Sequence, residues 1–327
     1  MNKDYYIFSN GRLKRKDNTL YFYDQDANRR TLPIENIDNL YVFGEIDLNS
    51  SFLNLLNQHD VRLHIFNYYG FYSGTFYPRS KKVSGYSVVN QSAHYLDKKK
   101  RIELARHFVH SAAYHMMRNL RYYQDRAQSY LNKIQELTPA IDLVSTIPEL
   151  MGVEGSIRQI YYDSFHVFLP KQFAFDQRSK RPPNDPLNAL ISFGNSLCYT
   201  AILSEMYKTH LDPTVSFLHE PSSKRFSLCL DLSEIFKPLL VDPTIFTLIN
   251  KRIISINDFT TIDNAVLLSD HGRKKFMKNW DEKLSTTIRH RKLNRKVSYR
   301  YFIRLECYKL IKHFLGDSPY KPLRAWW

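Results

Sequence analysis

The sequence has few cysteines and no long apolar run. Its 327 residues include three cysteines, Cys198, Cys229 and Cys307, and no pair has the C-x-x-C spacing. This usage argues against a disulfide framework and a zinc ribbon, so we expect a reducing, cytoplasmic environment. No apolar stretch is long enough to span a bilayer, and the first residues lack the basic-then-apolar pattern of a signal peptide. We therefore expect no membrane attachment.

Acidic residues are also outnumbered. The chain has 47 Lys and Arg against 32 Asp and Glu, a formal net charge of +15, and its hydrophobic fraction is 43%. That fraction supports a packed core and excludes a disordered polycation, while the length suits two domains. The excess of positive charge indicates an anionic partner, of which nucleic acid is the commonest. A basic protein without such a partner remains the alternative.

Residues 1–85 predict a small, mostly antiparallel β domain. Aromatic and β-branched residues dominate short runs that are punctuated by turns. The runs are 5–8, 19–23, 40–43, 61–66 and 71–77. One helix interrupts them, capped by Asn49 or Ser50, with Phe52, Leu55 and Leu56 facing the sheet.

After a linker at 86–94 the apolar period changes from two to about 3.6, which predicts a helical domain over residues 95–327. One stripe carries Ile102, Ala105, Phe108, Ala112, Met116, Leu120 and Tyr123. Further helices are expected at about 145–169, 186–209, 231–237, 243–250 and 296–315, the last of them strongly basic.

Glu154 is the first candidate for chemistry. On a helix over 145–169 it projects from a partly apolar face, and Gly152 and Gly155 beside it allow close approach of a backbone or a phosphate. The alternative is a purely structural ion pair with Arg158 at i, i+4.

His219, Asp231 and Glu234 complete the candidate cluster. His219 follows the β-type segment 215–218, and Asp231 and Glu234 lie three residues apart at the opening of the next expected helix. Carboxylates with one imidazole suit Mg²⁺ or Mn²⁺, and no P-loop or Ser-His-Asp pattern competes. The alternatives are a structural histidine, and Asp231 as an N-cap with Glu234 completing a capping-box-like pair.

Basic residues surround these candidates. Arg178 and Arg181 lie in a Pro-stiffened segment before the helix that carries Asn188, and Lys224 and Arg225 lie between His219 and Asp231. We expect DNA to be bound by five residues, of which the four cations would hold its phosphates: Arg178, Arg181, Asn188, Lys224 and Arg225. For the segment 178–185 the alternative is a solvated loop. A denser basic stretch covers 289–304, where helical spacing would place several cations on one side to follow a nucleic-acid backbone.

Four strings together resemble the Cas1 family of CRISPR-associated integrases. They are LMGVEG at 150–155, RPPNDPLNAL at 181–190, FLH at 217–219 and DLSEIFKP at 231–238. The likeness extends from FSNGRL at 8–13 to YKL at 308–310, and the N-terminal part is similar to the type I-B branch. It therefore covers nearly the whole chain.

The resemblance implies an α+β fold, with an N-terminal β-sandwich-like dimerisation domain followed by an α-helical catalytic domain. It implies a homodimer, two of which bracket a dimer of the small partner Cas2 and hold double-stranded DNA. It also implies a metal held by Glu154, His219 and Glu234, with Asp231 as a supporting neighbour. Many relatives have Asp where this chain has Glu234, so the resemblance leaves open how Glu234 and Asp231 share the binding of the metal.

The function expected from this resemblance is that of a metal-dependent DNA endonuclease and integrase. The 3′-hydroxyl of a protospacer would attack the CRISPR repeat by transesterification, and water in its place would cut DNA. Two alternatives remain: a non-catalytic nucleic-acid scaffold with a structural acidic cluster, and a repair nuclease acting on branched DNA.

Overall fold

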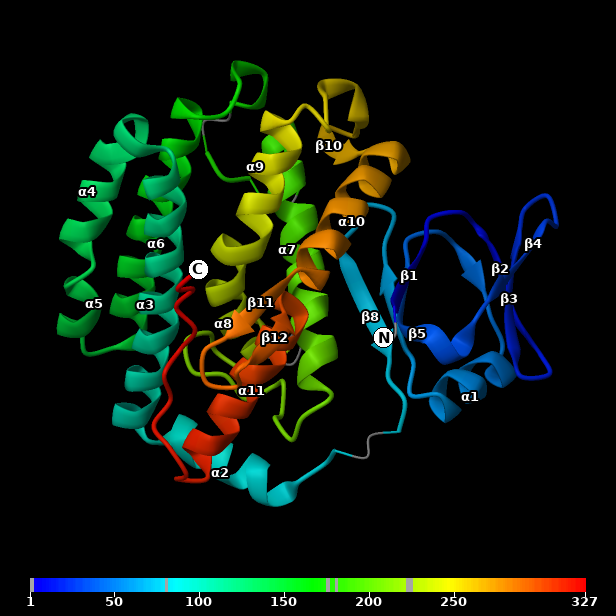
Figure 1. Cartoon of the computed structure of the whole chain (residues 1–327), viewed down its shortest axis with the longest axis horizontal. Coiled ribbons are helices and arrows are strands. Elements are labelled where there is room, and N and C mark those ends of the chain that lie inside the picture. The colour runs from blue at the N-terminus through cyan, green and yellow to red at the C-terminus, as the bar shows by residue number, and fades with distance from the viewer. Residues whose placement is uncertain (1–2, 80–81, 175–176, 180–181, 222–225) are drawn as a thin grey trace. The chain divides into compact units, whose positions relative to one another are not determined.

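The computed structural model describes residues 3–79, 82–174, 177–179, 182–221 and 226–327. The chain divides into two compact units, Met1–Val83 and Ser84–Trp327, the first rich in strands and the second mainly helical (Figure 1). The predicted α+β fold, with β structure before the helical part, is confirmed. Within the described residues, no helix is both long and apolar enough to cross a membrane.

The first unit contains two four-stranded sheets. One has the order β1-β5-β7-β8 and the other β4-β3-β2-β6. Their strands are β1 (Lys3–Ile7), β2 (Gly11–Lys16), β3 (Thr19–Asp24), β4 (Arg29–Leu32), β5 (Ile37–Val42), β6 (Ile46–Asp47), β7 (Arg62–Phe66) and β8 (Tyr72–Phe76). The 3₁₀ turn η1 (Ile34–Asn36) precedes β5, and helix α1 (Ser50–Gln58) precedes β7.

Strand direction in this unit differs from our expectation. In the first sheet β1, β5 and β7 run parallel, and only β8 is antiparallel to its neighbour. The prediction of a mostly antiparallel domain was therefore wrong for this sheet. Parallel neighbours need a crossover connection, which the β2–β4 strands supply between β1 and β5, and β6 with α1 supply between β5 and β7. Short apolar runs in the sequence do not reveal that direction.

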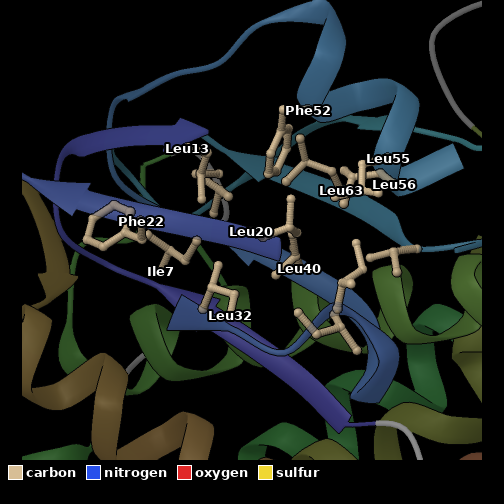
Figure 2. Close-up of a cluster of buried hydrophobic side chains, with 14 residues drawn as sticks. Ile7, Leu13, Leu20, Phe22, Leu32, Leu40, Phe52, Leu55, Leu56 and Leu63 are labelled. Carbon is tan, nitrogen blue, oxygen red and sulfur yellow. The ribbon is translucent and has the colours of Figure 1, made fainter. Parts of the chain in front are cut away.

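Leucines from both sheets and one helix share a core in the first unit (Figure 2). Leu13, Leu20 and Leu40 come from three different strands and are 0% exposed. The side chain of Asn49 caps α1 by accepting a hydrogen bond from the backbone N–H of Phe52 at 3.0 Å. Phe52, Leu55 and Leu56 are buried, as the sequence predicted.

The second unit is built from helices with two small hairpins. The helices are α2 (Gly85–Leu96), α3 (Lys98–Tyr122), α4 (Gln128–Leu137), α5 (Ala140–Leu143), α6 (Ile147–Asp163), α7 (Pro186–Met206), α8 (Ser227–Phe236), α9 (Asp242–Asn250), α10 (Asp270–Ser285) and α11 (Tyr299–Phe314). Single turns are η2 (Gln124–Ala127), η3 (Ser164–Val167), η4 (Lys171–Phe173), η6 (Ile256–Asp258) and the π-helical η5 (Lys237–Val241). The hairpins pair β9 (Phe259–Ile262) with β10 (Ala265–Leu268), and β11 (Thr287–His290) with β12 (Arg295–Ser298).

Helix α7 is the buried centre of this unit. Asp185 caps it and Pro186 occupies its first turn, as predicted. Most of its residues are buried on every side, which is the pattern of a central helix. A Cβ added at Gly194 would lie 2.5 Å from Cγ1 of Val241, so the glycine allows the η5 segment, which directly follows α8, to pack against α7.

Residues 86–94, which we expected to form a linker, lie within helix α2. The side chain of Gln91 is buried and donates to the backbone carbonyls of Asp212 at 2.9 Å and Val215 at 2.8 Å. These long-range bonds fix α2 to the helical unit, and nothing in the local sequence indicates them.

The expected basic helix near 296–315 begins later than predicted. Ser298 caps α11 by accepting from the N–H of Tyr301 at 3.2 Å, so the helix starts at Tyr299. The basic residues before it lie on the hairpin β11–β12, whose turn places Asn294 at a positive φ of 50°. The helix itself is confirmed as Tyr299–Phe314. The expected helical spacing of the cations before it was wrong, because Thr287–His290 and Arg295–Ser298 pair as strands and give their side chains the two-residue period of a sheet.

Candidate active site

Glu154 lies in the middle of helix α6. The helix begins at a capping box, in which the Thr146 hydroxyl accepts from the N–H of Glu149 and the Glu149 carboxylate accepts from the N–H of Thr146. It ends at Asp163, before the expected boundary of 169, because the chain tightens into the turn η3. The side chain of Glu154 is 17% exposed, which places its carboxylate at the edge of the packed interior.

The glycines beside Glu154 leave the helix surface open. Gly152 and Gly155 are exposed, and a Cβ added at either would meet nothing within 4 Å. The backbone of α6 is therefore accessible there to a bulky ligand. This is the property that the sequence led us to expect from the two glycines.

Asp231 organises the loop that carries His219. One carboxylate oxygen, Oδ2, accepts the backbone N–H groups of Phe217 at 2.7 Å and Leu218 at 3.1 Å, and Oδ1 accepts that of His219 at 2.9 Å. The N–H groups of 217–219 are thus bound to a side chain, and the segment 215–218 forms no strand, contrary to our expectation. Buried N–H groups need such partners, so Asp231 fixes the position of the loop.

Asp231 is not a helix cap. Helix α8 begins at Ser227, so Asp231 lies inside it with a side chain that is 0% exposed. The alternative reading as an N-cap is therefore wrong, and with it the capping-box-like role of Glu234. The sequence misled us because the apolar residues before Asp231 already belong to the helix.

His219 and Asp231 form a hydrogen-bonded pair. His219 Nδ1 lies 2.8 Å from Oδ1 of Asp231. We assign the proton to Nδ1, which leaves the lone pair of the neutral ring on Nε2. Burial disfavours the imidazolium, but the hydrogen bond and the charge of Asp231, with the charge of Glu234, outweigh it and raise the pKa of His219.

Glu234 lies one helical turn after Asp231 and is nearly buried, with a side-chain exposure of 6%. Its Oε1 accepts a hydrogen bond from Nζ of Lys237 at 2.7 Å, and its Oε2 pairs with the guanidinium of Arg158. Burial alone would raise the pKa of Glu234, but the charges of Arg158 and Lys237 outweigh it and lower the pKa to about 2. Glu234 is therefore an anion in the folded protein.

Arg158 joins the two helices. Its Nε donates to Oε1 of Glu154 at 2.6 Å, and its Nη2 contacts both Glu154 and Glu234. The ion pair with Glu154 that the sequence offered as an alternative is therefore present, and the same guanidinium also holds Glu234. Because both carboxylates bind one nitrogen atom, Glu154 and Glu234 lie next to each other although 80 positions separate them in the sequence.

The chemical types of these side chains, though not their present arrangement, suit a hard divalent cation. Two carboxylates meet at one point, and the nearby imidazole has Nε2 as its lone-pair nitrogen, which together suit Mg²⁺ or Mn²⁺. Over the residues that the structure describes, no three His, Cys, Asp or Glu side chains are arranged as a metal site. The positive charge between Glu154 and Glu234 is supplied by Arg158. A cation would bind the same oxygens in its place.

Arg178 and Asn188, both predicted to bind DNA, contact each other. Nη1 of Arg178 donates to Oδ1 of Asn188 at 2.7 Å, and Nη2 donates to the hydroxyl of Ser192 at 2.9 Å. Asn188 is 0% exposed, and its Nδ2 donates to the carbonyl of Gln177 at 2.9 Å. The structure therefore contradicts a direct DNA contact for Asn188, whose amide holds the preceding loop. Arg178 is half-buried, and burial lowers the pKa of its guanidinium.

Three other predicted phosphate contacts, Arg181, Lys224 and Arg225, lie outside the described residues. They remain predictions from the sequence. Their neighbours in the chain, Pro182 and Phe226, are described, and the N–H of Phe226 donates to the hydroxyl of Tyr199 at 3.1 Å. That bond ties the start of α8 to α7.

Sequence reasoning missed two cations that position the site. Lys237 lies three residues after Glu234 and pairs with it at 2.7 Å, so the helical spacing contained the signal. Arg101 donates to the carbonyl of Phe217 at 2.9 Å and to the carboxylate of Glu220 at 2.6 Å. It braces the histidine loop from both sides, across more than a hundred residues, for which the sequence has no local signal.

Known proteins match the chain over its full length. The family model described as CRISPR associated protein Cas1 matches residues 5–282. The CRISPR-associated endonuclease Cas1 of Clostridium perfringens (strain SM101 / Type A) is 54% identical over 330 residues, which cover 100% of each chain. A solved CAS1 protein from Thermotoga maritima has a TM-score of 0.89 at 38% identity, covering 98% of this chain and 100% of that one. A casposase bound to integration product has a TM-score of 0.88 at 22% identity, covering 97% and 91%, and shows a likeness of fold alone. The chain therefore belongs to the CRISPR associated protein Cas1 family.

Proposed function

We propose that this chain is a metal-dependent DNA endonuclease and integrase that inserts protospacer DNA into a CRISPR array. The observation that carries the proposal is the meeting of Glu154 and Glu234 beside His219, whose ring is oriented by the buried Asp231. Membership of the Cas1 family and the name endonuclease of a relative that is 54% identical support the same reaction class.

Glu154, Glu234 and Nε2 of His219 are the atoms that would hold Mg²⁺ or Mn²⁺. The bound cation would neutralise charge on the phosphate and make an attacking hydroxyl or water more acidic. Asp231 keeps the imidazole in one orientation through its bond to Nδ1. Lys237 holds Oε1 of Glu234, so that carboxylate is positioned from one side before substrate arrives.

The proposed reaction is a transesterification. A 3′-hydroxyl oxygen of the protospacer forms a new bond to a phosphorus of the repeat, the in-line P–O bond to the 3′ oxygen of the repeat breaks, and the proton of the attacking hydroxyl balances the leaving 3′-alkoxide. Water in place of the hydroxyl gives hydrolysis of the same bond. The exposed backbone beside Gly152 and Gly155 leaves room for the polymer.

A strand-transfer assay with purified protein and Mn²⁺ tests the proposal. Glu154→Gln and His219→Ala should each lower the rate about a thousandfold, the scale of losing a principal electrostatic contribution to phosphoryl transfer. Glu149→Gln is the matched control, because Glu149 lies on the same helix and is exposed. Unchanged product from Glu154→Gln and His219→Ala would favour a non-catalytic scaffold and sink the metal-site assignment.

The choice of target separates integration from repair. The same assay compares a repeat-containing duplex with an unrelated duplex and with a branched DNA. Preferential joining to the repeat supports the integrase, whereas equal use of all three targets favours a repair nuclease.

We also propose that the protein works in the cytoplasm as a homodimer that joins a Cas2 dimer and double-stranded DNA. Its three cysteines are free and buried, as a reducing compartment allows. In the N-terminal unit Ile65, Tyr68 and Tyr69 are exposed, with 40%, 64% and 42% of their surface accessible, which suits a protein interface. Light scattering of the protein alone and with Cas2 tests both assemblies.

The proposed phosphate contacts remain Arg178, Arg181, Lys224 and Arg225.

A further inference from the structure

The hairpin β11–β12 has a concentration of positive charge that the proposed active site does not use. Five cations fall in one stretch of eight residues of the hairpin, 289–296, and all five are exposed. They are Arg289, Arg291, Lys292, Arg295 and Lys296. No acidic residue follows β11 in the sequence until Glu306.

These five cations have no carboxylate partners among the residues whose structure is described. The next two arginines in the chain differ, because Arg300 lies 3.8 Å from a carboxylate oxygen of Asp281 and Arg304 lies 2.7 Å from Glu205. Arg300 and Arg304, on the helix that follows the hairpin, are therefore paired with carboxylates of other helices, whereas, within the described residues, the five hairpin cations are not.

The strand register places like charges face to face. Arg289 and Lys296 are direct cross-strand partners. Like charges directly opposite each other destabilise a strand pair. An anion bound across both cations would remove this repulsion, so the arrangement is suited to a polyanion.

One face of the hairpin is fixed and its cations are partly positioned in advance. His290 stacks on Phe302 with ring centroids 5.6 Å apart, which attaches the hairpin to α11. Arg291 lies 5.2 Å from the ring of Trp326. Arg295 lies 5.2 Å from the ring of Tyr301 and donates to its hydroxyl at 3.2 Å. Side chains held in this way lose less conformational entropy when they bind a phosphate.

The shape of this element favours duplex DNA. Each strand has four residues, about 13 Å at the usual rise of a strand. The major groove of B-DNA admits a two-stranded ribbon, whose exposed cations then lie near the phosphates at the groove edges, whereas the major groove of A-form RNA is too narrow. We propose that the β11–β12 hairpin binds the phosphate backbone of double-stranded DNA, at a site separate from Glu154, His219 and Glu234. The proposal rests on the proposed function only in taking DNA as the substrate.

Fluorescence anisotropy with a short labelled DNA duplex tests the proposal, using the full chain in EDTA at several salt concentrations. The double variant Arg289→Gln/Lys296→Gln should raise the Kd about tenfold and reduce the slope of log K against log salt by about two. The control Lys274→Gln/Lys278→Gln removes the same charge from exposed positions on α10 and should change both quantities less. Equal effects of the two double variants would overturn the proposal.

Other arms of the same experiment separate the remaining outcomes. Arg289→Lys should keep the affinity, because the charge is retained, and a loss as large as that of the double variant would contradict a phosphate contact. A larger loss on single-stranded DNA or on an RNA duplex than on the DNA duplex would overturn the choice of ligand. Glu154→Gln should bind the duplex like the unmodified chain. If that variant also keeps strand transfer, the proposed function fails while the hairpin result stands.

Discussion

The candidate active site and the β11–β12 hairpin use charge in opposite ways. At the active site Arg158, Lys237, Glu154 and Glu234 are half-buried or buried, and each has a partner of opposite sign. On the hairpin Arg289 and Lys296 are exposed and lie opposite each other. Paired charges fix the positions of side chains, whereas unpaired cations leave a surface that a mobile polyanion can neutralise.

The difference also sets the size of the effects that substitutions should have. Removing one member of a buried network leaves polar groups without partners and costs several kcal/mol. Removing an exposed cation changes stability by a few tenths of a kcal/mol but changes binding to DNA through counterion release. Stability should therefore respond mainly at the first region, and salt-dependent binding at the second.

The largest loss of stability is expected at Asp231. Asp231→Ala removes the acceptor for the N–H groups of Phe217, Leu218 and His219. Buried donors left without partners cost about 1–3 kcal/mol each. Partial relaxation of the loop reduces the sum, so we expect the free energy of unfolding to fall by about 3–5 kcal/mol. Urea denaturation monitored by circular dichroism measures it.

The control for that substitution is Asp142→Ala. Asp142 also pairs with a histidine, since its Oδ1 lies 2.8 Å from Nε2 of His110, but its side chain is 64% exposed. An exposed pair of this kind contributes less than about 1 kcal/mol. If Asp231→Ala and Asp142→Ala lost the same stability, the organising role of Asp231 would be refuted.

A second prediction concerns pH and the buried Asp242 near Arg158. Burial raises the pKa of Asp242 to about 7, although the charge of Arg158 and a hydrogen bond from the Tyr161 hydroxyl at 3.0 Å oppose the rise. Below the ordinary pKa near 4 the carboxyl is neutral in both folded and unfolded chains. Between about pH 4 and pH 7 the unfolded chain has released this proton while the folded protein still holds it, so the free energy of unfolding falls across that range and levels off above the folded pKa.

Asp242→Asn removes that ionisation and keeps an oxygen for Tyr161. The difference in unfolding free energy between the variant and the unmodified chain should shift in favour of the variant by about 2 kcal/mol when the pH is raised from 5 to 8. Urea midpoints at the two pH values measure the gain. A difference between the two proteins that is the same at pH 5 and pH 8 would show that Asp242 titrates normally.

Much of the fold could be predicted because its signals are local. The cap at Asn49 and the apolar triplet Phe52, Leu55 and Leu56 are encoded within ten residues, and the structure has both. The parallel direction of β1, β5 and β7 could not be predicted, because it depends on which distant strands pair. The start of α11 was misplaced because the hairpin before it is stabilised by cross-strand pairing and by contacts with Phe302 and Trp326.

The candidate site divides in the same way. Glu154 and Arg158 are one helical turn apart, so their contact follows from spacing alone. The sequence does not show that Arg158 also reaches Glu234, or that Asp231 binds three N–H groups of a loop, because those contacts join separate elements. Asn188 was predicted to bind DNA, but tertiary packing buries it, and the sequence has no local signal for that burial.

A third prediction tests competition between Arg158 and a cation. Arg158→Met removes the guanidinium that contacts both Glu154 and Glu234. The two carboxylates then repel each other, so Mn²⁺ should bind about tenfold more tightly, or about 1.4 kcal/mol, as measured by isothermal titration calorimetry. Melting temperatures with and without Mn²⁺ should differ more for the variant than for the unmodified chain.

Lys237→Met is the matched control, because Lys237 contacts Glu234 but leaves the contact between Glu154 and Arg158 in place. Its gain in Mn²⁺ affinity should be smaller. Weaker Mn²⁺ binding by Arg158→Met would mean that the guanidinium assembles the site instead of competing for it. No Mn²⁺ binding by any of the three proteins would instead contradict the metal site itself.

The smallest effect is expected on the hairpin, where one substitution can turn repulsion into attraction. Lys296→Glu places a carboxylate opposite Arg289, and an opposite-charge cross-strand pair should stabilise the chain by about 0.5 kcal/mol. Lys292→Glu makes the same change in net charge between the two strands, outside their paired register. Lys296→Glu should therefore raise the urea midpoint more than Lys292→Glu does, and salt should reduce the difference by screening. Equal midpoints would show that the facing cations do not repel measurably. The repulsion that a bound polyanion is proposed to relieve would then be absent.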